Sequence, residues 1–295
     1  MSDTPNKTGS QPRSQDVRLR SRIELAAERS SRAREIAAQH EALALTDSVP
    51  LRDLHHRMAA VHRRMEQRHL VTVDLYGSVL ASLQRPKSQD AGRQPGIPSL
   101  LSATAELAGS AGAVLALFDS SQAEALFLAS DATARRAHDL EFKLGEGPSI
   151  DATRARGAVS ASGRQMCERW QLFGPEVAAL DVHAVAAAPL QAGPACLGTL
   201  TVLNPVREVT DPAIDLLGEA LAYSLIDAFQ AGAEGLIPVD GDQWTAIYKA
   251  VGMISARHGC APADALALIR ARAFTMGSDV HLVAGSIIRG EDNQV

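Results

Sequence analysis

Two linker-like stretches divide this chain, and they limit what it can fold into more than any other feature of the sequence. The first is QRPKSQDAGRQPGI, a run of Pro, Gly, Gln and Ser with no apolar period, and the second is AEGLIPVDGDQ. At 295 residues the chain is long enough for more than one domain. We therefore predict a disordered tail at 1–14, a helical stalk at 15–83, linkers at 84–97 and 233–243, a middle unit at 98–232 and a C-terminal unit at 244–290.

The stalk has the pattern of two charged helices. The first covers residues 15–45, and a second pattern begins after Pro50, because proline can open a helix but cannot continue one. Apolar residues of the second pattern alternate at spacings of three and four, which is typical of the seam of a coiled coil or a helical hairpin. The seam needs a partner, which is the helix before it, the same helix of a second subunit, or both. Its residues are Leu51, Leu54, Met58, Val61 and Met65.

Three histidines, His55, His62 and His69, repeat every seven residues along one edge of this seam. Positions seven apart on a helix are separated by about 10.5 Å along its axis. Two such residues of one helix cannot hold one metal ion, because zinc–ligand bonds are only about 2 Å long. We therefore interpret the histidines as positions that flank the seam, and we predict no metal site.

The middle unit mixes short apolar runs with helical segments. The runs AGAVLALFD, EALFLASD, HAVAAAPLQ and LGTLTVLNP have the length of strands, and AGPAC forms a turn between the last two. Helical patterns stand near both ends of the unit. This mixture indicates an α+β domain built around an antiparallel sheet.

Three short helical patterns follow the second linker. Ile247, Val251 and Ile254 share one face of the first, and the phrases HGCAP and TMGSD separate the three. Pro262 suits the first turn of the second helix. A unit of about 45 residues is small for an independent core, so we expect it to pack elsewhere or to dimerise.

Charge is distributed unevenly over the chain, whose net charge is −5. Residues 87–243 carry 10 Lys/Arg against 20 Asp/Glu, whereas residues 244–290 carry 5 against 2. Such asymmetry is typical of a basic part that meets a polyanion, although ordinary solvated faces give the same count.

The sequence contains no constellation typical of a catalytic site: it has no Walker loop, no HExxH, no GxSxG and no GxGxxG before a helix. Its cysteines, Cys167, Cys196 and Cys260, are widely spread without CxxC spacing, which favours a reducing compartment. The N-terminus has no apolar segment of a secretory signal, and no apolar run approaches the roughly 20 residues that span a bilayer. We predict a cytoplasmic protein that is not an enzyme and that needs no metal or cofactor.

The middle unit resembles a sensory domain. The phrases SAGAVLALFD, LFLASD, LGEGPSIDA and APLQAGPACLGTLTVLN are similar to those of the GAF domains of actinobacterial regulators. Ser149 stands where many of those domains have a cysteine. The resemblance implies a GAF-like α/β sandwich with an antiparallel sheet that receives a small-molecule or protein signal, its ligand unidentified. The loop positions that match are Asp131, Glu146, Gly147 and Pro148.

The C-terminal unit is similar to the ANTAR domain, a three-helix RNA-binding module of antiterminators, over IYKAVGMISARHGCAPADALALIRARAFTMGSDVHLVAGSII. Small residues in register carry the similarity, and we expect them to pack helices together. Gly252 costs about 1 kcal/mol relative to alanine inside a helix, so we expect a close backbone approach there. The small residues are Ala250, Gly252, Ala265, Ala273 and Ala284.

Five residues of this unit are candidate RNA contacts. Lys249 and Arg257 flank one surface, because eight residues turn a helix by about 80°. Tyr248 is placed to stack on a base. Arg270 and Arg272 are the remaining candidates, and they point about 200° apart. The alternative is that these cations are solvated surface.

The resemblance implies a signal-responsive transcription antiterminator that binds paired RNA hairpins as a homodimer and does not bind a membrane. Two alternatives remain open. One is a GAF-fold redox enzyme or sensor that uses Cys167 and Cys196, since some GAF-fold proteins reduce methionine sulfoxide with cysteines. The other is a protein–protein module whose basic helices only mediate dimer contacts.

Overall fold

A computed structural model describes residues 11–84, 97–119, 124–206, 211–230 and 241–292. Of the predicted tail at 1–14, residues 1–10 lie outside the described residues, while residues 11–14 belong to the first helix. The greater part of both predicted linkers also lies outside, at 85–96 and 231–240.

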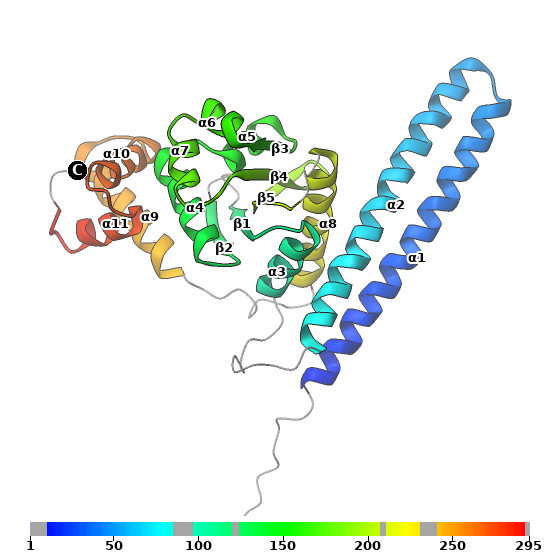
Figure 1. Cartoon of the computed structure of the whole chain (residues 1–295), viewed down its shortest axis with the longest axis horizontal. Coiled ribbons are helices and arrows are strands. Elements are labelled where there is room, and N and C mark those ends of the chain that lie inside the picture. Colours follow the sequence, from blue (N-terminus) through cyan, green and yellow to red (C-terminus); the bar gives the residue numbers. More distant parts are fainter. Residues whose placement is uncertain (1–10, 85–96, 120–123, 207–210, 231–240, 293–295) are drawn as a thin grey trace, which may run out of the picture.

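The first two helices form an antiparallel hairpin within one chain. Helix α1 (Gln11–Thr46) packs along α2 (Val49–Gln84), and Figure 1 shows the pair projecting from one side of the middle unit. The predicted seam of α2 is only partly covered: Met58 and Met65 are half-buried, whereas Leu51, Leu54 and Val61 are exposed. The face of α1 that is buried instead presents a row of small side chains, which lets the two helices approach closely. That row is Ala26, Ala33, Ala37 and Ala44.

The histidines lie in the contact between α1 and α2 and do not flank it. His55 Nδ1 is 2.9 Å from His40 Nδ1, and His55 Nε2 is 2.9 Å from a carboxylate oxygen of Asp47. The ring of His62 stacks on that of His40 at a centroid distance of 6.0 Å. The interpretation of His55 and His62 as flanks was therefore wrong, because their rings contact His40 of α1.

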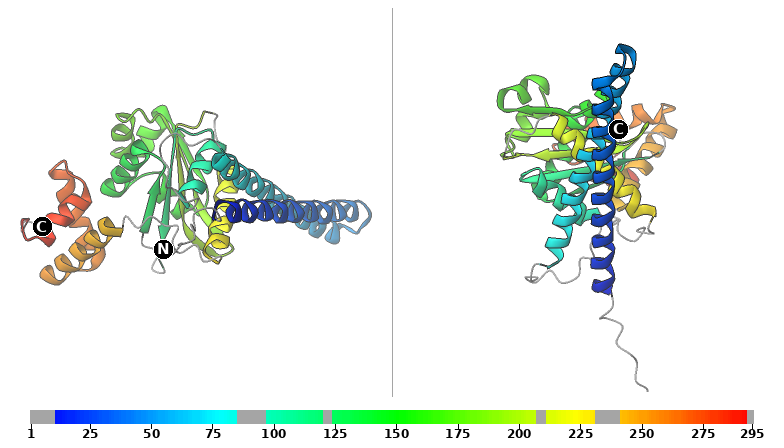
Figure 2. Two further views of the ribbon diagram at one scale, coloured as in Figure 1. Left: turned by 90° about the horizontal axis from the view of Figure 1, so that it is seen from below. Right: turned by 90° about the vertical axis from the view of Figure 1, so that its right-hand side faces the viewer.

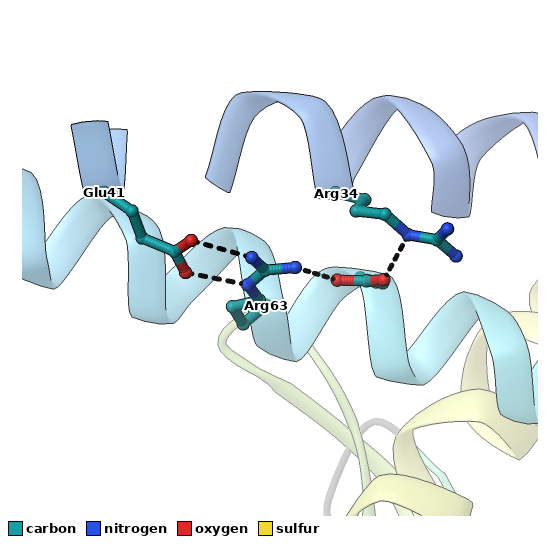
Figure 3. A network of polar contacts seen from close by, with 4 residues as sticks. Arg34, Glu41 and Arg63 are labelled. Carbon is teal, nitrogen blue, oxygen red and sulfur yellow. Dashed lines mark hydrogen bonds and ion pairs between the residues drawn. The ribbon is translucent and has the colours of Figure 1, made fainter. Parts of the chain in front are cut away.

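Ion pairs tie the two helices of the hairpin together, as Figure 3 shows. Arg63 of α2 bonds Glu41 of α1 at 2.8 Å and Glu66 of its own helix at 3.0 Å. Glu66 in turn accepts a hydrogen bond of 2.7 Å from Arg34 of α1. The hydrogen bond from Arg63 lowers the pKa of Glu41. Exposed pairs contribute little free energy singly, but this alternating chain of charges fixes the register of the hairpin.

The middle unit is an α+β domain, as predicted. Within the described residues its strands form a five-stranded antiparallel sheet in the order β2-β1-β5-β4-β3. The short edge strand β3 was not among the predicted runs. The strands are β1 (Gly112–Phe118), β2 (Glu124–Ala129), β3 (Val159–Ser162), β4 (Ala184–Ala192) and β5 (Ala195–Leu203).

Successive residues of the strands face two different cores, because side chains alternate across a sheet. Ala113 and Leu115 of β1 face one core, which includes α2, whereas Val114 and Ala116 face the other. Further helices complete the first core: α3 (Ile97–Leu107) and α8 (Asp211–Gln230). The second core is covered by α4 (Ala132–Leu144), α5 (Pro148–Ala155), α6 (Gly163–Arg169) and α7 (Phe173–Ala178).

The C-terminal unit consists of α9 (Gly241–His258), α10 (Pro262–Thr275) and α11 (Val280–Ile288), which pack on one another. Figures 1 and 2 show it on the side of the middle unit away from the hairpin, where α10 contacts α4 and α9 contacts β2. None of the described helices is long and apolar enough to cross a membrane.

Candidate functional site

The small residues of the C-terminal unit fall into two groups. Four alanines at the helix contacts, Ala250, Ala265, Ala273 and Ala284, are fully buried. Gly252 is exposed, and a Cβ atom added there would meet nothing within 4 Å. The predicted close backbone approach at Gly252 is therefore wrong, because the buried side of α9 runs through Ala250 and Ile254.

Gly252 instead belongs to an open face of α9. Five exposed residues at helical spacing make up this face, which we call the α9 face: Lys249, Gly252, Met253, Ala256 and Arg257. The two cations stand at its ends, two turns apart, with only small or apolar residues between them. Neither cation forms an ion pair within the described part of the chain.

Two of the predicted RNA contacts are occupied at the boundary with the middle unit. The hydroxyl of Tyr248 donates a hydrogen bond to the main-chain carbonyl of Glu124 in β2. The guanidinium of Arg270 stands 4.3 Å above the ring of Phe142 in α4. Burial lowers the pKa of Arg270 and raises that of Tyr248. Arg270 is half-buried at this contact, whereas Tyr248 keeps an exposed fraction of 42%, and the assignment of both as RNA contacts stays a prediction.

Arg272 is also occupied, but by its own unit. Its Nε lies 2.9 Å from Oδ2 of Asp292, and its Nη2 lies 3.3 Å from Oδ1. Asp292 is buried, with an exposed fraction of 6%. Such a two-point pair fixes the chain after α11 against α10, so Arg272 acts in packing. Lys249 and Arg257 are left as the predicted contacts that face solvent.

A buried pair of charges lies under the contact with the middle unit. His138 of α4 has an exposed fraction of 4%, and its Nε2 lies 2.7 Å from Oε1 of Glu124. Burial lowers the pKa of His138, but the carboxylates of Glu124 and Glu141 outweigh it, so the net shift is upward. A cavity of about 20 Å³ separates His138 from Ile247 and His281 of the C-terminal unit. We missed this pair in the sequence, where His138 is a single histidine in a charged helix.

The loop residues that match the GAF pattern hold local structure. Asp131 caps α4, since its Oδ1 accepts the N–H of Ala134 at 2.9 Å. Glu146 accepts the N–H of Phe173 at 2.9 Å, and the buried Pro148 opens α5. Gly147 has a φ of +155°, and a Cβ atom there would lie 2.6 Å from Oε1 of Glu141.

The N-terminus of α5 is already occupied by an anion of the chain itself. Oε1 of Glu141 accepts the N–H groups of Ser149 at 2.7 Å and Ile150 at 3.2 Å. Burial raises the pKa of Glu141, although His138 and these N–H groups oppose the shift. Because helix N-termini attract anions, this carboxylate takes the place that a phosphate would need.

Metal binding and thiol chemistry find little support in the part of the chain that the structure describes. No three His, Cys, Asp or Glu side chains of that part are arranged to hold a metal ion. Cys167 and Cys196 are not joined by a disulfide and lie on separate elements, α6 and β5, where Sγ of Cys196 donates to the carbonyl of Gly198 at 3.3 Å. In comparisons with known proteins, no family model matches this chain and no curated protein matches it. The α9 face and the contact with the middle unit are the features on which a function can be argued.

Proposed function

We propose that this chain is a cytoplasmic, signal-responsive transcription antiterminator that binds paired RNA hairpins as a homodimer through its C-terminal unit. The observation that carries the proposal is the α9 face. There Lys249 and Arg257 stand exposed and without ion pairs in the described chain, on either side of Gly252.

The chemistry of the α9 face suits a phosphate backbone. Its two cations are separated by about 12 Å along the helix axis, at 1.5 Å per residue. Gly252 leaves the space between them open, and glycine is the residue that lets a backbone approach a ligand closely. Close approach of a phosphate backbone would explain why a glycine stands at position 252, which helix packing does not explain.

Two cations supply only weak binding, so the proposal requires two copies acting on one RNA. The exposed apolar residues Leu51, Leu54 and Val61 of α2 support pairing of the hairpin with a second subunit, since α1 does not cover them. Linking two binding units in a dimer raises the affinity for a two-hairpin RNA without any new contact.

The contact with the middle unit supplies the response to a signal. While Tyr248 and Arg270 are bound to β2 and α4, the unpaired cations that the described residues of the unit offer RNA are those of the α9 face, Lys249 and Arg257. A signal that loosens this contact adds a stacking ring and a third cation to the RNA-binding surface. The GAF-like resemblance of the middle unit supports its role as the receiver.

A titration with RNA tests the proposal. We expect a labelled RNA with two hairpins to bind the full chain at 50 mM salt, with an affinity that falls as salt is raised toward 200 mM, because phosphate contacts release counterions. A single hairpin of the same sequence is the control, and it should bind more weakly. Absence of binding to either RNA at low salt would overturn the proposal.

A further inference from the structure

A cavity of about 410 Å³ opens where the N-terminal hairpin meets α8, on the side of the molecule away from the α9 face. Its walls come from α1, α2 and α8. Sites for small molecules usually have volumes of about 300–1,000 Å³, so this cavity is large enough for an organic ligand.

The walls of this cavity are strongly cationic. Four arginines line it against one acidic residue, Asp227. Arg29 and Arg32 stand at its exposed rim, three residues apart on α1 and therefore on one face, and neither forms an ion pair within the described residues. The other two arginines are Arg22 and Arg68.

Arg22 and Arg68 are held in place by aromatic rings. Arg22 donates to the hydroxyl of Tyr76 at 3.2 Å and to the carbonyl of Asp227 at 2.9 Å. The guanidinium of Arg68 stands 4.2 Å above the ring of Tyr223. These contacts fix two positive charges in the wall without neutralising them.

Buried polar atoms in the same walls have no partner. Ser224 of α8 has an exposed fraction of 1%, and its Oγ makes no hydrogen bond. Nδ1 of His62 on α2 is likewise buried and unpartnered, and both residues line the cavity. Buried polar groups are normally hydrogen-bonded, but these two atoms have almost no accessible surface, so the arginines and not these atoms define the polar part of the cavity.

Apolar side chains complete the lining, among them Leu25, Ile36 and Met65. We propose that this cavity binds an organic anion with an apolar body, whose acidic group is held by Arg29 and Arg32 at its rim. The inference goes beyond the proposed RNA function and stands without it, because the site shares no residue with the C-terminal unit.

An aromatic sulfonate tests this site. Anilinonaphthalene sulfonate is titrated into the full chain, with its fluorescence as the readout, beside the uncharged phenylnaphthylamine, which has the same rings without the acid. We expect saturable binding of one sulfonate per chain, about tenfold or more tighter than the neutral compound, because a bond to a charged group dominates. Equal binding of the two compounds would overturn the proposal.

Substitutions in the cavity wall test whether the sulfonate binds in this cavity. Arg29→Gln with Arg32→Gln should weaken sulfonate binding by about tenfold or more, and Arg18→Gln with Arg20→Gln, the same change outside the cavity on α1, should not. Unchanged binding in the first variant contradicts the site. If that variant loses its helical circular dichroism, Leu25→Trp is measured instead. The larger side chain enters the cavity from a half-exposed position, so we expect reduced binding. Unchanged binding overturns the proposal.

Discussion

The hairpin and the C-terminal unit contact the middle unit in opposite ways. Helix α2 enters a shared core with Leu75, Tyr76 and Val79, none of them more than 3% exposed. The C-terminal unit also joins a core of the middle unit, but its contact with β2 and α4 includes the polar groups of Tyr248 and Arg270, which can exchange their partners for water. Releasing either contact exposes apolar surface, but water can replace part of the second contact, so we expect its release to cost less. We therefore call the contact with the hairpin the fixed joint and the contact with the C-terminal unit the releasable joint.

The largest expected effect lies in the fixed joint. Leu75→Ala should lower the free energy of unfolding by about 2–5 kcal/mol, because it leaves a cavity in a core shared by two units. Urea denaturation followed by circular dichroism measures the change. Leu70→Ala at an exposed position of the same helix is the control, with an expected change within about 0.5 kcal/mol. An equal loss of unfolding free energy in both variants would contradict the claim that α2 is fixed to the middle unit by its buried side chains.

The same substitution in two regions should have opposite signs. Gly198 of β5 has a φ of +154°, and a Cβ atom there would lie 1.9 Å from the carbonyl oxygen of Ala116, so Gly198→Ala should destabilise by more than about 1 kcal/mol. Gly252→Ala should stabilise by up to about 1 kcal/mol, since its face is open. Thermal melting of both variants measures this. A loss of stability at Gly252 would restore the packing role that the sequence predicted.

Local patterns explain what the sequence could and could not predict. Four strands were recognisable as short apolar runs between turns, but β3 has only four residues, with two polar side chains. The seam of α2 was predicted only in part, because the face that is covered depends on the alanine row of another helix. The burial of Arg270 could not be predicted from the sequence either, because its partner Phe142 belongs to a different unit. The alanines of the C-terminal unit were predictable because their partners are close in sequence.

The buried His138 makes the releasable joint sensitive to pH. Because the pKa of His138 is raised in the folded state, its contribution to stability is complete below the unfolded value of about 6.5 and is lost as pH rises through the folded pKa. Stability should therefore fall as the pH is raised above about 6.5. Urea midpoints across this range measure the effect.

His138→Gln is the variant that isolates this effect, because it removes the titrating group beside Glu124. Burial also raises the pKa of Glu141, which gives a fall of the same sign that begins nearer its unperturbed value of 4.5. The fall above pH 6.5 should thus disappear in the variant. Its persistence there would assign the pH dependence to another group.

A smaller effect is expected at the releasable joint itself. Tyr248→Phe with Arg270→Gln should change the free energy of unfolding by only about 1–2 kcal/mol, since it removes one hydrogen bond and one cation–π contact. Hydrogen exchange followed by mass spectrometry should show faster exchange in β2 and α4 and no change in α2 and α8. Unchanged protection in β2 and α4 would show that these two residues do not hold the joint.

The affinity of variants for the two-hairpin RNA tests the central claim that the exposed α9 face, and not the docked residues, meets RNA first. Lys249→Gln with Arg257→Gln should lower the affinity by about tenfold or more at low salt, while sedimentation shows the same oligomeric state as the wild type. Arg270→Gln should leave the affinity equal or higher, because Arg270 is held against Phe142. Wild-type affinity in the Lys249/Arg257 variant, or a loss confined to the Arg270 variant, would contradict the account.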